Sequence, residues 1–453
     1  MYFFSEHTKK LIKFSTPICL ISLLSMSVSF IAMLFVAQVG KEELAAAALA
    51  NVGYMVVMTF STTSLYSISI LVGATSGNMV QNHIIIRNGI WSALFLGLIS
   101  SVILWWAPAI LRLFRQDELL VSKTIDYFHF MSVSIIPILL TMIQSQYYIG
   151  VRRTNFSSYL SLIRIPFTLV LSYIFILGKY HAPRMGLAGV SFSVLIVESV
   201  FCLSLYGVRY IYFRRQVSTQ ECKTDFLSLD IIKKILKIGI PIGLQFSGEL
   251  AAMTLALYMM GFFGVIALAA SQIVSQYSML MVMITLGLSQ GVAVLVSESV
   301  ENNDYHSVMR YRISAIKVIL SLSLIFFMMF FFFSDWLITP FMKNPNELLM
   351  DLGSKLFTVV AFAMPIDAFR NIISGYFRGL KDSMTPMRVG LFSLWFISLP
   401  LSYCLAFGLR QGPVGLRVGF AIGILVASVM TWFKVIKKEQ SDFSQEIVSK
   451  SVN

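Results

Sequence analysis

PIGLQFSGELAAMTLALYMMGFFGVIALAA, residues 241–270, contains one charged side chain, Glu249, among mostly apolar residues. A helix needs about 20 mostly apolar residues to cross the hydrocarbon of a bilayer. The whole chain has this character, because 57% of its 453 residues are hydrophobic and only 13% are charged. Soluble domains carry about 25% charged residues, so this chain lacks the charges to cover a globular surface. The sequence therefore predicts an all-α membrane protein.

Stretches of this kind recur along the chain and predict twelve transmembrane helices. Their approximate bounds are 10–38, 44–73, 86–107, 119–150, 155–178, 185–212, 231–261, 264–298, 308–334, 347–378, 384–407 and 413–435.

The orientation of these helices follows from Lys and Arg, which accumulate on the cytoplasmic side of membrane proteins. With the N-terminus inside, the cytoplasmic segments hold more than twice as many Lys and Arg residues as the segments on the opposite side. Arg164 is counted among the residues on the cytoplasmic side. This bias, rather than nucleic-acid binding, explains the net charge of +13. We expect a multi-pass protein of the cell inner membrane with both termini in the cytoplasm.

The two halves of the chain are related in sequence, because residues 17–78 register on residues 241–302 without a gap. We expect an N-terminal six-helix lobe at 1–213, a cytoplasmic linker at 214–230 and a C-terminal six-helix lobe at 231–453. Parallel repeats of this kind suit a transporter with alternating access, and a channel built from repeats is the alternative. The matched positions include Pro17 with Pro241, Gly40 with Gly264 and Val72 with Val296. Later parts match at a slightly larger shift, which pairs Gly150 with Gly379.

Residues that carry enzyme or metal chemistry are not clustered in the sequence. Cys19, Cys202 and Cys404 lie inside apolar runs, Cys222 lies in the linker, and the five histidines are scattered. This pattern is neither a disulfide framework nor a zinc site. We therefore expect no cofactor, no resident metal and no enzymatic activity, with an intramembrane enzyme as the alternative from another class.

Charges inside predicted spans are costly in hydrocarbon and mark candidate functional sites. Glu249 and Asp367 should lie at similar depth on two helices of the C-terminal half, and Glu249 has no other charge near it in sequence. Two such carboxylates can hold a proton or a sodium ion, or bind a cationic substrate. The alternative is a structural contact between helices, and Arg370, three residues after Asp367, could pair with that carboxylate.

Several other residues are candidates for a substrate cleft or for a hinge. Glu198 is an acid in the sixth span without an obvious partner, and each cleft candidate could equally pack between helices. Pro241 and Pro365 are hinge candidates, because a proline inside a helix frees a backbone carbonyl and permits a kink. The cleft candidates are Gln272, Gln276, Arg370, Met283 and Glu198.

At these residues the chain resembles bacterial members of the MATE (multidrug and toxic compound extrusion) family. The most specific match is Pro365-x-Asp367 followed by GYFRGLKDS at residues 375–383, which is similar to the family's D…G-x-L-R-G-x-K-D-[ST] pattern. Pro241, Glu249 and the run from Gly264 to Gln272 resemble the start of the family's second half. The likeness extends over nearly the whole chain.

The resemblance implies two pseudo-symmetric six-helix lobes in a V shape around a central cleft. It also implies antiport of organic, often cationic, multidrug-type compounds against protons or sodium. Glu249, Gln272 and Asp367 match family positions tied to the cation and substrate sites. We expect an organic small molecule and membrane lipid as partners, no nucleic acid, and a monomer. The alternative within the same superfamily is a flippase for lipid-linked oligosaccharides or peptidoglycan precursors.

The chain departs from the family pattern at positions that bear on the coupling ion. Ala32 stands where many members carry an aspartate, and Thr168 and Ser172 stand where they carry Asn or Asp. Ala363 stands where related sequences often have Tyr. These departures leave the N-terminal half without its usual ionisable site. They favour protons over sodium as the coupling ion at Glu249 and Asp367.

Overall fold

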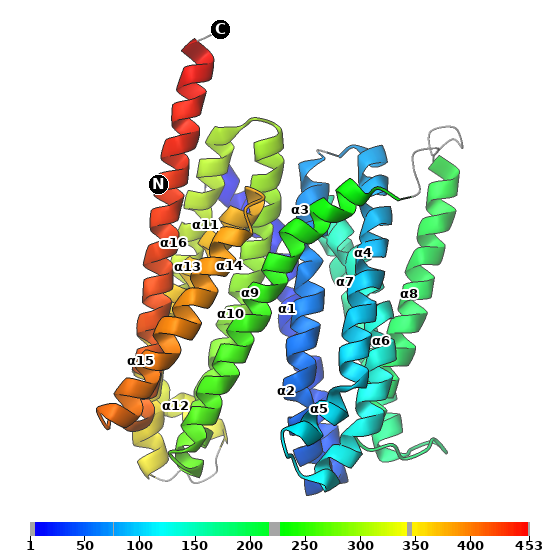
Figure 1. Cartoon of the computed structure of the whole chain (residues 1–453), viewed down its shortest axis with the longest axis vertical. Helices are drawn as coiled ribbons and strands as arrows, with labels where there is room; N and C mark the ends of the chain where they lie inside the picture. Colours follow the sequence, from blue (N-terminus) through cyan, green and yellow to red (C-terminus); the bar gives the residue numbers. More distant parts are fainter. Residues whose placement is uncertain (1–4, 76, 217–226, 342–346, 452–453) are drawn as a thin grey trace. The chain divides into compact units, whose positions relative to one another are not determined.

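Helices make up every regular element in residues 5–75, 77–216, 227–341 and 347–451, which are the residues that the structure describes. The structure is a computed structural model of the whole chain (Figure 1). The long helices are α1 (Glu6–Val39), α2 (Lys41–Ser64), α4 (Met79–Trp105), α6 (Glu118–Gly150), α7 (Thr154–Leu177), α8 (Ala188–Gln216), α9 (Leu229–Gly261), α10 (Val265–Glu301), α11 (Tyr305–Phe332), α13 (Glu347–Gly379) and α16 (Gly412–Ser451). The shorter segments are α3 (Tyr66–Ala74), α5 (Ala107–Leu113), α12 (Ser334–Ile338), η1 (Thr339–Phe341), α14 (Met384–Phe392), η2 (Ser393–Ser398), α15 (Leu399–Tyr403) and η3 (Cys404–Gly408).

These helices confirm the all-α membrane architecture with its twelve spans. Among the described residues, eleven helical stretches are long and apolar enough to cross a bilayer, and α1 occupies the first predicted span. The second span consists of α2 and α3, which meet at Leu65. The eleventh span, Met384–Gly408, contains the π-helical segments η2 and η3 on either side of Pro400. A proline there removes an N–H donor, and a local change of helix type is a usual accommodation.

The chain divides into two internally packed units. Unit 1 consists of Met1–Cys19 and Gly248–Asn453, and unit 2 consists of Leu20–Ser247. The division therefore falls inside α1 and inside α9. Most of the predicted linker at 214–230 lies outside the described residues, and the lobe boundaries proposed from the sequence stay a prediction.

One contact between helices occurs in both units and supports the internal repeat. In unit 2, a Cβ atom placed on Gly150 of α6 would lie 2.7 Å from the side chain of Val72 of α3. In unit 1, a Cβ atom on Gly379 of α13 would lie 2.7 Å from the side chain of Val296 of α10. The sequence repeat pairs these same glycines and valines. The same close approach of two helices, which only glycine permits, is therefore built twice.

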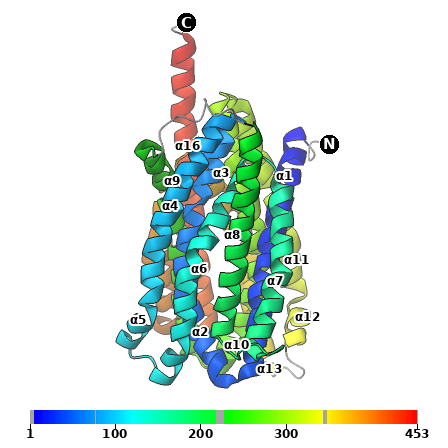
Figure 2. The same cartoon turned by 90° about the vertical axis from the view of Figure 1, so that its right-hand side faces the viewer.

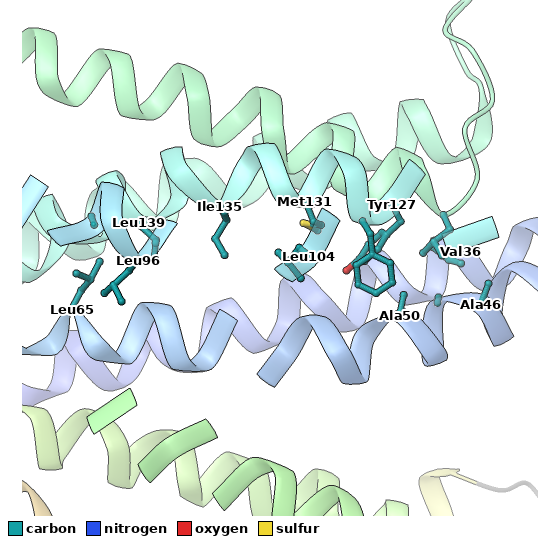
Figure 3. Close-up of a cluster of buried hydrophobic side chains, with 14 of the residues drawn as sticks. Val36, Ala46, Ala50, Leu65, Leu96, Leu104, Tyr127, Met131, Ile135 and Leu139 are labelled. Atoms are coloured by element: carbon teal, nitrogen blue, oxygen red, sulfur yellow. The ribbon is translucent and has the colours of Figure 1, made fainter. Parts of the chain in front are cut away.

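The core of unit 2 lies between α6 and its neighbours. Tyr127, Met131, Ile135 and Leu139 are spaced four residues apart, so they share one face of α6, and all four are buried (Figure 3). α6 packs against α2, α4 and α8, and α7 packs against α8 (Figure 2).

The core of unit 1 is organised around α13. This helix packs against α10, α11 and α16. Its second half, from Ala368 to Gly379, is buried at all but one position. Polar side chains in this part of α13 therefore have to find partners inside the unit.

Candidate functional site

Arg370 joins the two carboxylates that the sequence analysis selected. Arg370 and Asp367 lie on α13 and Glu249 lies on α9, all within unit 1. The guanidinium donates to Glu249 from Nη1 to Oε1 at 2.7 Å and from Nη2 to Oε2 at 3.1 Å. It also donates to Oδ1 of Asp367, from Nε at 3.0 Å and from Nη2 at 2.9 Å. We call these three side chains the Arg370 cluster.

Helix geometry holds Asp367 in this arrangement. Asp367 and Arg370 are three residues apart, so they are neighbours on the surface of α13. Asn371 lies one turn after Asp367 and donates from Nδ2 to its Oδ2 at 3.2 Å and to its backbone carbonyl at 3.1 Å. Asp367 is therefore held by its own helix, whereas Glu249 reaches the guanidinium from α9.

The Arg370 cluster is buried and contains two carboxylates but only one positive group. The exposed fractions of the side chains are 4% for Arg370, 9% for Glu249 and 11% for Asp367. With both carboxylates ionised, the cluster has one net negative charge, which is costly in a buried, membrane-embedded position. Uptake of one proton makes the cluster neutral. The arrangement is therefore suited to binding and releasing a proton.

A sodium ion fits this cluster less well than a proton. Carboxylate oxygens suit hard cations in general. Here each of the four carboxylate oxygens already accepts a hydrogen bond from Arg370 or Asn371. A sodium ion would have to displace the guanidinium or lie beside its positive charge.

The sequence correctly predicted that the two carboxylates lie together, but it missed the role of Arg370. The sequence suggested Arg370 as a partner of Asp367 alone, and the structure shows that it bonds to Glu249 as well. A guanidinium has five N–H donors, and a single aspartate does not use them all. That surplus of donors was the signal in the sequence for a second acid.

The predicted cleft residues of α10 do not belong to the Arg370 cluster. Gln272 and Gln276 are exposed, and Met283 is half-buried. The hinge candidates Pro241 and Pro365 lie inside α9 and α13, and both helices continue through the proline. The proposed roles of these residues in a cleft or a hinge stay predictions.

Glu198 has a partner that the sequence did not indicate. It lies on α8 in unit 2, and its Oε1 is 2.9 Å from Nη1 of Arg164. Arg164 lies inside α7 (Thr154–Leu177), within the predicted fifth span, and its assignment to the cytoplasmic side stays a prediction. The second oxygen of Glu198, Oε2, is buried and has no hydrogen-bond partner within the described ranges. The N-terminal half therefore keeps an ion pair in which the Glu198 side chain is 10% exposed and that of Arg164 is 27% exposed.

Comparison with other sequences identifies the relatives of this chain. The sequence model of the MatE family matches residues 17–174 and 241–404, which together exceed half of the chain. A protein of Agrobacterium fabrum named probable multidrug resistance protein NorM is 26% identical over 433 residues, covering 94% of this chain and 92% of its own. The multidrug resistance protein MdtK of Photorhabdus laumondii is 24% identical over 445 residues, covering 95% of both chains.

Comparison with solved structures shows the same fold. A structure described as the outward-facing conformation of a multidrug resistance MATE family transporter of the MOP superfamily gives a TM-score of 0.82 at 17% identity. The match covers 96% of both chains. The sequence model matches both halves of the repeat, and the fold agrees over nearly the whole length. The chain therefore belongs to the MatE family.

Proposed function

We propose that this chain is a secondary active antiporter that exports organic, multidrug-type compounds, cations among them, in exchange for protons by alternating access. The observation that carries the proposal is the buried Arg370 cluster, in which two carboxylates share one guanidinium. Membership of the MatE family supports a transport function. The relatives named above are called multidrug resistance proteins, which favours export of organic compounds over the flippase hypothesis.

Coupling follows from the net charge of the cluster. With Glu249 and Asp367 ionised, one negative charge is left over, and an organic cation outside the cluster can balance it without being coordinated by the carboxylate oxygens. Protonation removes that charge, so the cation loses its counter-charge and is released. A ligand shifts a conformational equilibrium only through its different affinities for the two states. Competition of proton and cation for one charge supplies such a difference, and it links uptake of one to release of the other.

Glu249 is the carboxyl that we assign as the proton carrier. Asp367 accepts hydrogen bonds from Arg370 and Asn371 on its own helix, so it keeps its partners when Glu249 is protonated. Protonation of Glu249 instead weakens a contact between α9 and α13. Proton binding at this carboxyl can therefore alter how two long helices are held together.

The placement in the cell is part of the proposal. The bias of Lys and Arg between the loops supports a position in the cell inner membrane with both termini in the cytoplasm. Both halves of the repeat occur in one chain, and this supports a monomer as the working unit.

The test uses purified protein in liposomes with an imposed proton gradient and a fluorescent organic cation. Wild-type protein should move the cation against its gradient, and an uncoupler should stop it. Glu249→Gln should abolish this transport, because glutamine keeps the size of the side chain but exchanges no proton. The matched control is Glu301→Gln, which should transport at the wild-type rate, since Glu301 of unit 1 is 50% exposed and pairs with Lys381.

Three results would overturn parts of the proposal. Wild-type transport by Glu249→Gln, at an equal amount of folded protein, would exclude Glu249 as the coupling carboxyl. Transport driven by a sodium gradient without a pH difference, and insensitive to the uncoupler, would replace the proton with sodium. Failure of the wild-type protein to move the cation under either gradient would overturn the substrate class.

A further inference from the structure

Arg417 lies inside a membrane span, and all its partners are uncharged. It belongs to unit 1 and comes five residues after the start of α16, which is about 8 Å along the helix axis. Its Nη2 atom donates to Oγ of Ser271 at 2.8 Å, to the carbonyl of Ser271 at 3.2 Å and to Oγ of Ser275 at 2.7 Å. Both serines belong to α10. The guanidinium therefore joins two helices, and its charge is not neutralised.

The absence of a carboxylate distinguishes Arg417 from other arginines inside the helices. Arg164, Arg312 and Arg370 each form an ion pair with a carboxylate. Arg417 forms none with the residues that the structure describes. Its Nε and Nη1 atoms donate to no described residue either, and neither atom is buried. Because arginine is always protonated, these N–H groups and a full positive charge are accessible to a ligand.

The internal repeat shows a carboxylate at the corresponding place in unit 2. Glu43 lies in the first turn of α2, and its Oε2 accepts from the backbone N–H of Leu187 at 3.0 Å. Its Oε1 is 3.3 Å from Nζ of Lys123 on α6. An acid, a base and the residue before α8 therefore meet at this end of unit 2.

Unit 1 lacks this acid and has an arginine there. The repeat pairs the three residues of that contact with apolar residues, Glu43 with Ala267, Leu187 with Leu416 and Lys123 with Leu352. The three apolar residues pack in one cluster of unit 1, and Arg417 directly follows Leu416. One place in the repeated fold thus contains a carboxylate in unit 2 and an uncompensated positive charge in unit 1. A bound anion would supply the missing negative charge.

The depth of Arg417 indicates which anion it meets. The span Gly412–Gln440 has 29 residues and is about 43 Å long, close to the thickness of a bilayer with its head groups. Arg417 lies about 8 Å from one end of this span, near the boundary between head groups and hydrocarbon. Phosphate is the anionic group of phospholipids at that level. Guanidinium groups bind phosphate through strong, charge-assisted hydrogen bonds.

We propose that Arg417 binds a phosphate group between α10 and α16, supplied by the head group of an anionic phospholipid or by free phosphate. The phosphate oxygens accept from Nε and Nη1, while Nη2 stays bonded to Ser271 and Ser275. A zwitterionic head group carries its own ammonium ion, so it binds more weakly. This site goes beyond the proposed export of cations, because it takes an anion and includes no residue of the Arg370 cluster.

The experiment counts phospholipid molecules bound to the full-length protein in detergent by native mass spectrometry. Wild-type protein should bind its first phosphatidylglycerol at least about tenfold more tightly than phosphatidylethanolamine, the effect of a hydrogen bond to a charged group. Arg417→Gln should bind the two lipids equally. The matched control is Arg410→Gln, which removes the same charge from an exposed residue just before α16 and should keep the preference.

A second pair of variants tests the charge without removing Arg417. Ser271→Asp should abolish the preference, because its carboxylate would lie beside the guanidinium that now donates to Oγ at 2.8 Å. Ser271→Asn has the same shape without the charge and should keep the preference.

Thermal unfolding in sodium phosphate, compared with sodium chloride at equal ionic strength, distinguishes the two sources of phosphate. A ligand that binds only the folded protein raises the Tm. A rise that the wild-type protein shows and Arg417→Gln lacks would identify free phosphate as a ligand. A preference for phosphatidylglycerol without such a rise would identify the lipid head group.

Each of three outcomes would overturn the proposal. The first is a wild-type protein with neither the lipid preference nor the rise in Tm, which would leave water as the partner of the free N–H groups. The second is either effect surviving in Arg417→Gln or in Ser271→Asp. The third is an equal loss in Arg410→Gln, which would show a response to surface charge alone. These measurements use no ion gradient, so a failure of coupling at Glu249 would not affect them.

Discussion

Replacing Arg370 with methionine should destabilise the protein more than any other single change in the Arg370 cluster. Arg370 donates four hydrogen bonds, two to Glu249 and two to Asp367. Methionine fills a similar space but supplies no donor and no charge. The two carboxylates, with side chains 9% and 11% exposed, would then face each other without a counter-ion.

The expected loss follows from this burial. Removing one partner of a buried ion pair costs about 3–5 kcal/mol, because the remaining charge stays buried without compensation. The total free energy of unfolding of a domain is about 5–15 kcal/mol, so Arg370→Met should lose a large part of it. Replacing all three side chains, as Arg370→Met with Glu249→Gln and Asp367→Asn, removes every charge and should restore most of the stability.

Equilibrium unfolding of the purified protein in mixed detergent micelles would measure these differences at pH 7. The control is Arg112→Met, which should leave stability unchanged, because Arg112 pairs with Glu118 at an exposed position. Acidification should partly rescue Arg370→Met, since protonation removes the repulsion between the carboxylates. The reasoning is refuted if Arg370→Met unfolds like the wild-type protein, or if the triple variant is no more stable than Arg370→Met alone.

Two smaller predictions concern helix packing and helix capping. Gly375→Ala should lower the free energy of unfolding by about 1–3 kcal/mol through overpacking, because the new Cβ would lie 2.4 Å from the carbonyl oxygen of Ser289. Gly261→Ala, whose Cβ would meet nothing within 4 Å, is the control, and equal stability of the two variants would contradict the packing argument. Asp304 accepts from the backbone N–H of Ser307 at 3.0 Å at the start of α11, and hydrogen bonds from Ser307 lower its pKa below the usual 3.8. Asp304→Ala should therefore cost about 1 kcal/mol. Because the folded-state pKa is lowered, the contribution of the charged cap is complete above pH 3.8 and is lost as the pH falls through the folded-state value. The free energy of unfolding of the wild-type protein should therefore contain a contribution that is lost as the pH falls below 4. This pH-dependent loss should be absent in Asp304→Asn, and the same loss in that variant would show that another group causes it.

The sequence alone determined the class of protein, the helices and the repeat. Length and apolarity of a span are local properties, so each predicted stretch became helical without knowledge of its neighbours. The repeat was also readable, because Gly150 and Gly379 each stand where two helices approach too closely for a side chain. A glycine at a preserved spacing records such an approach in the sequence itself. The presence of Glu249 and Asp367 inside spans likewise marked the helices that carry the candidate site.

Only the tertiary structure decided which charged side chains meet. Arg370 bonds to Glu249 from a helix more than a hundred residues away in the chain, and Arg164 pairs with Glu198 although they belong to different helices. The partner of a side chain depends on the rotation of each helix about its axis and on which helices are neighbours. The hydrophobic pattern of a membrane helix defines that rotation weakly, because the lipid-facing side and the packed side are both apolar.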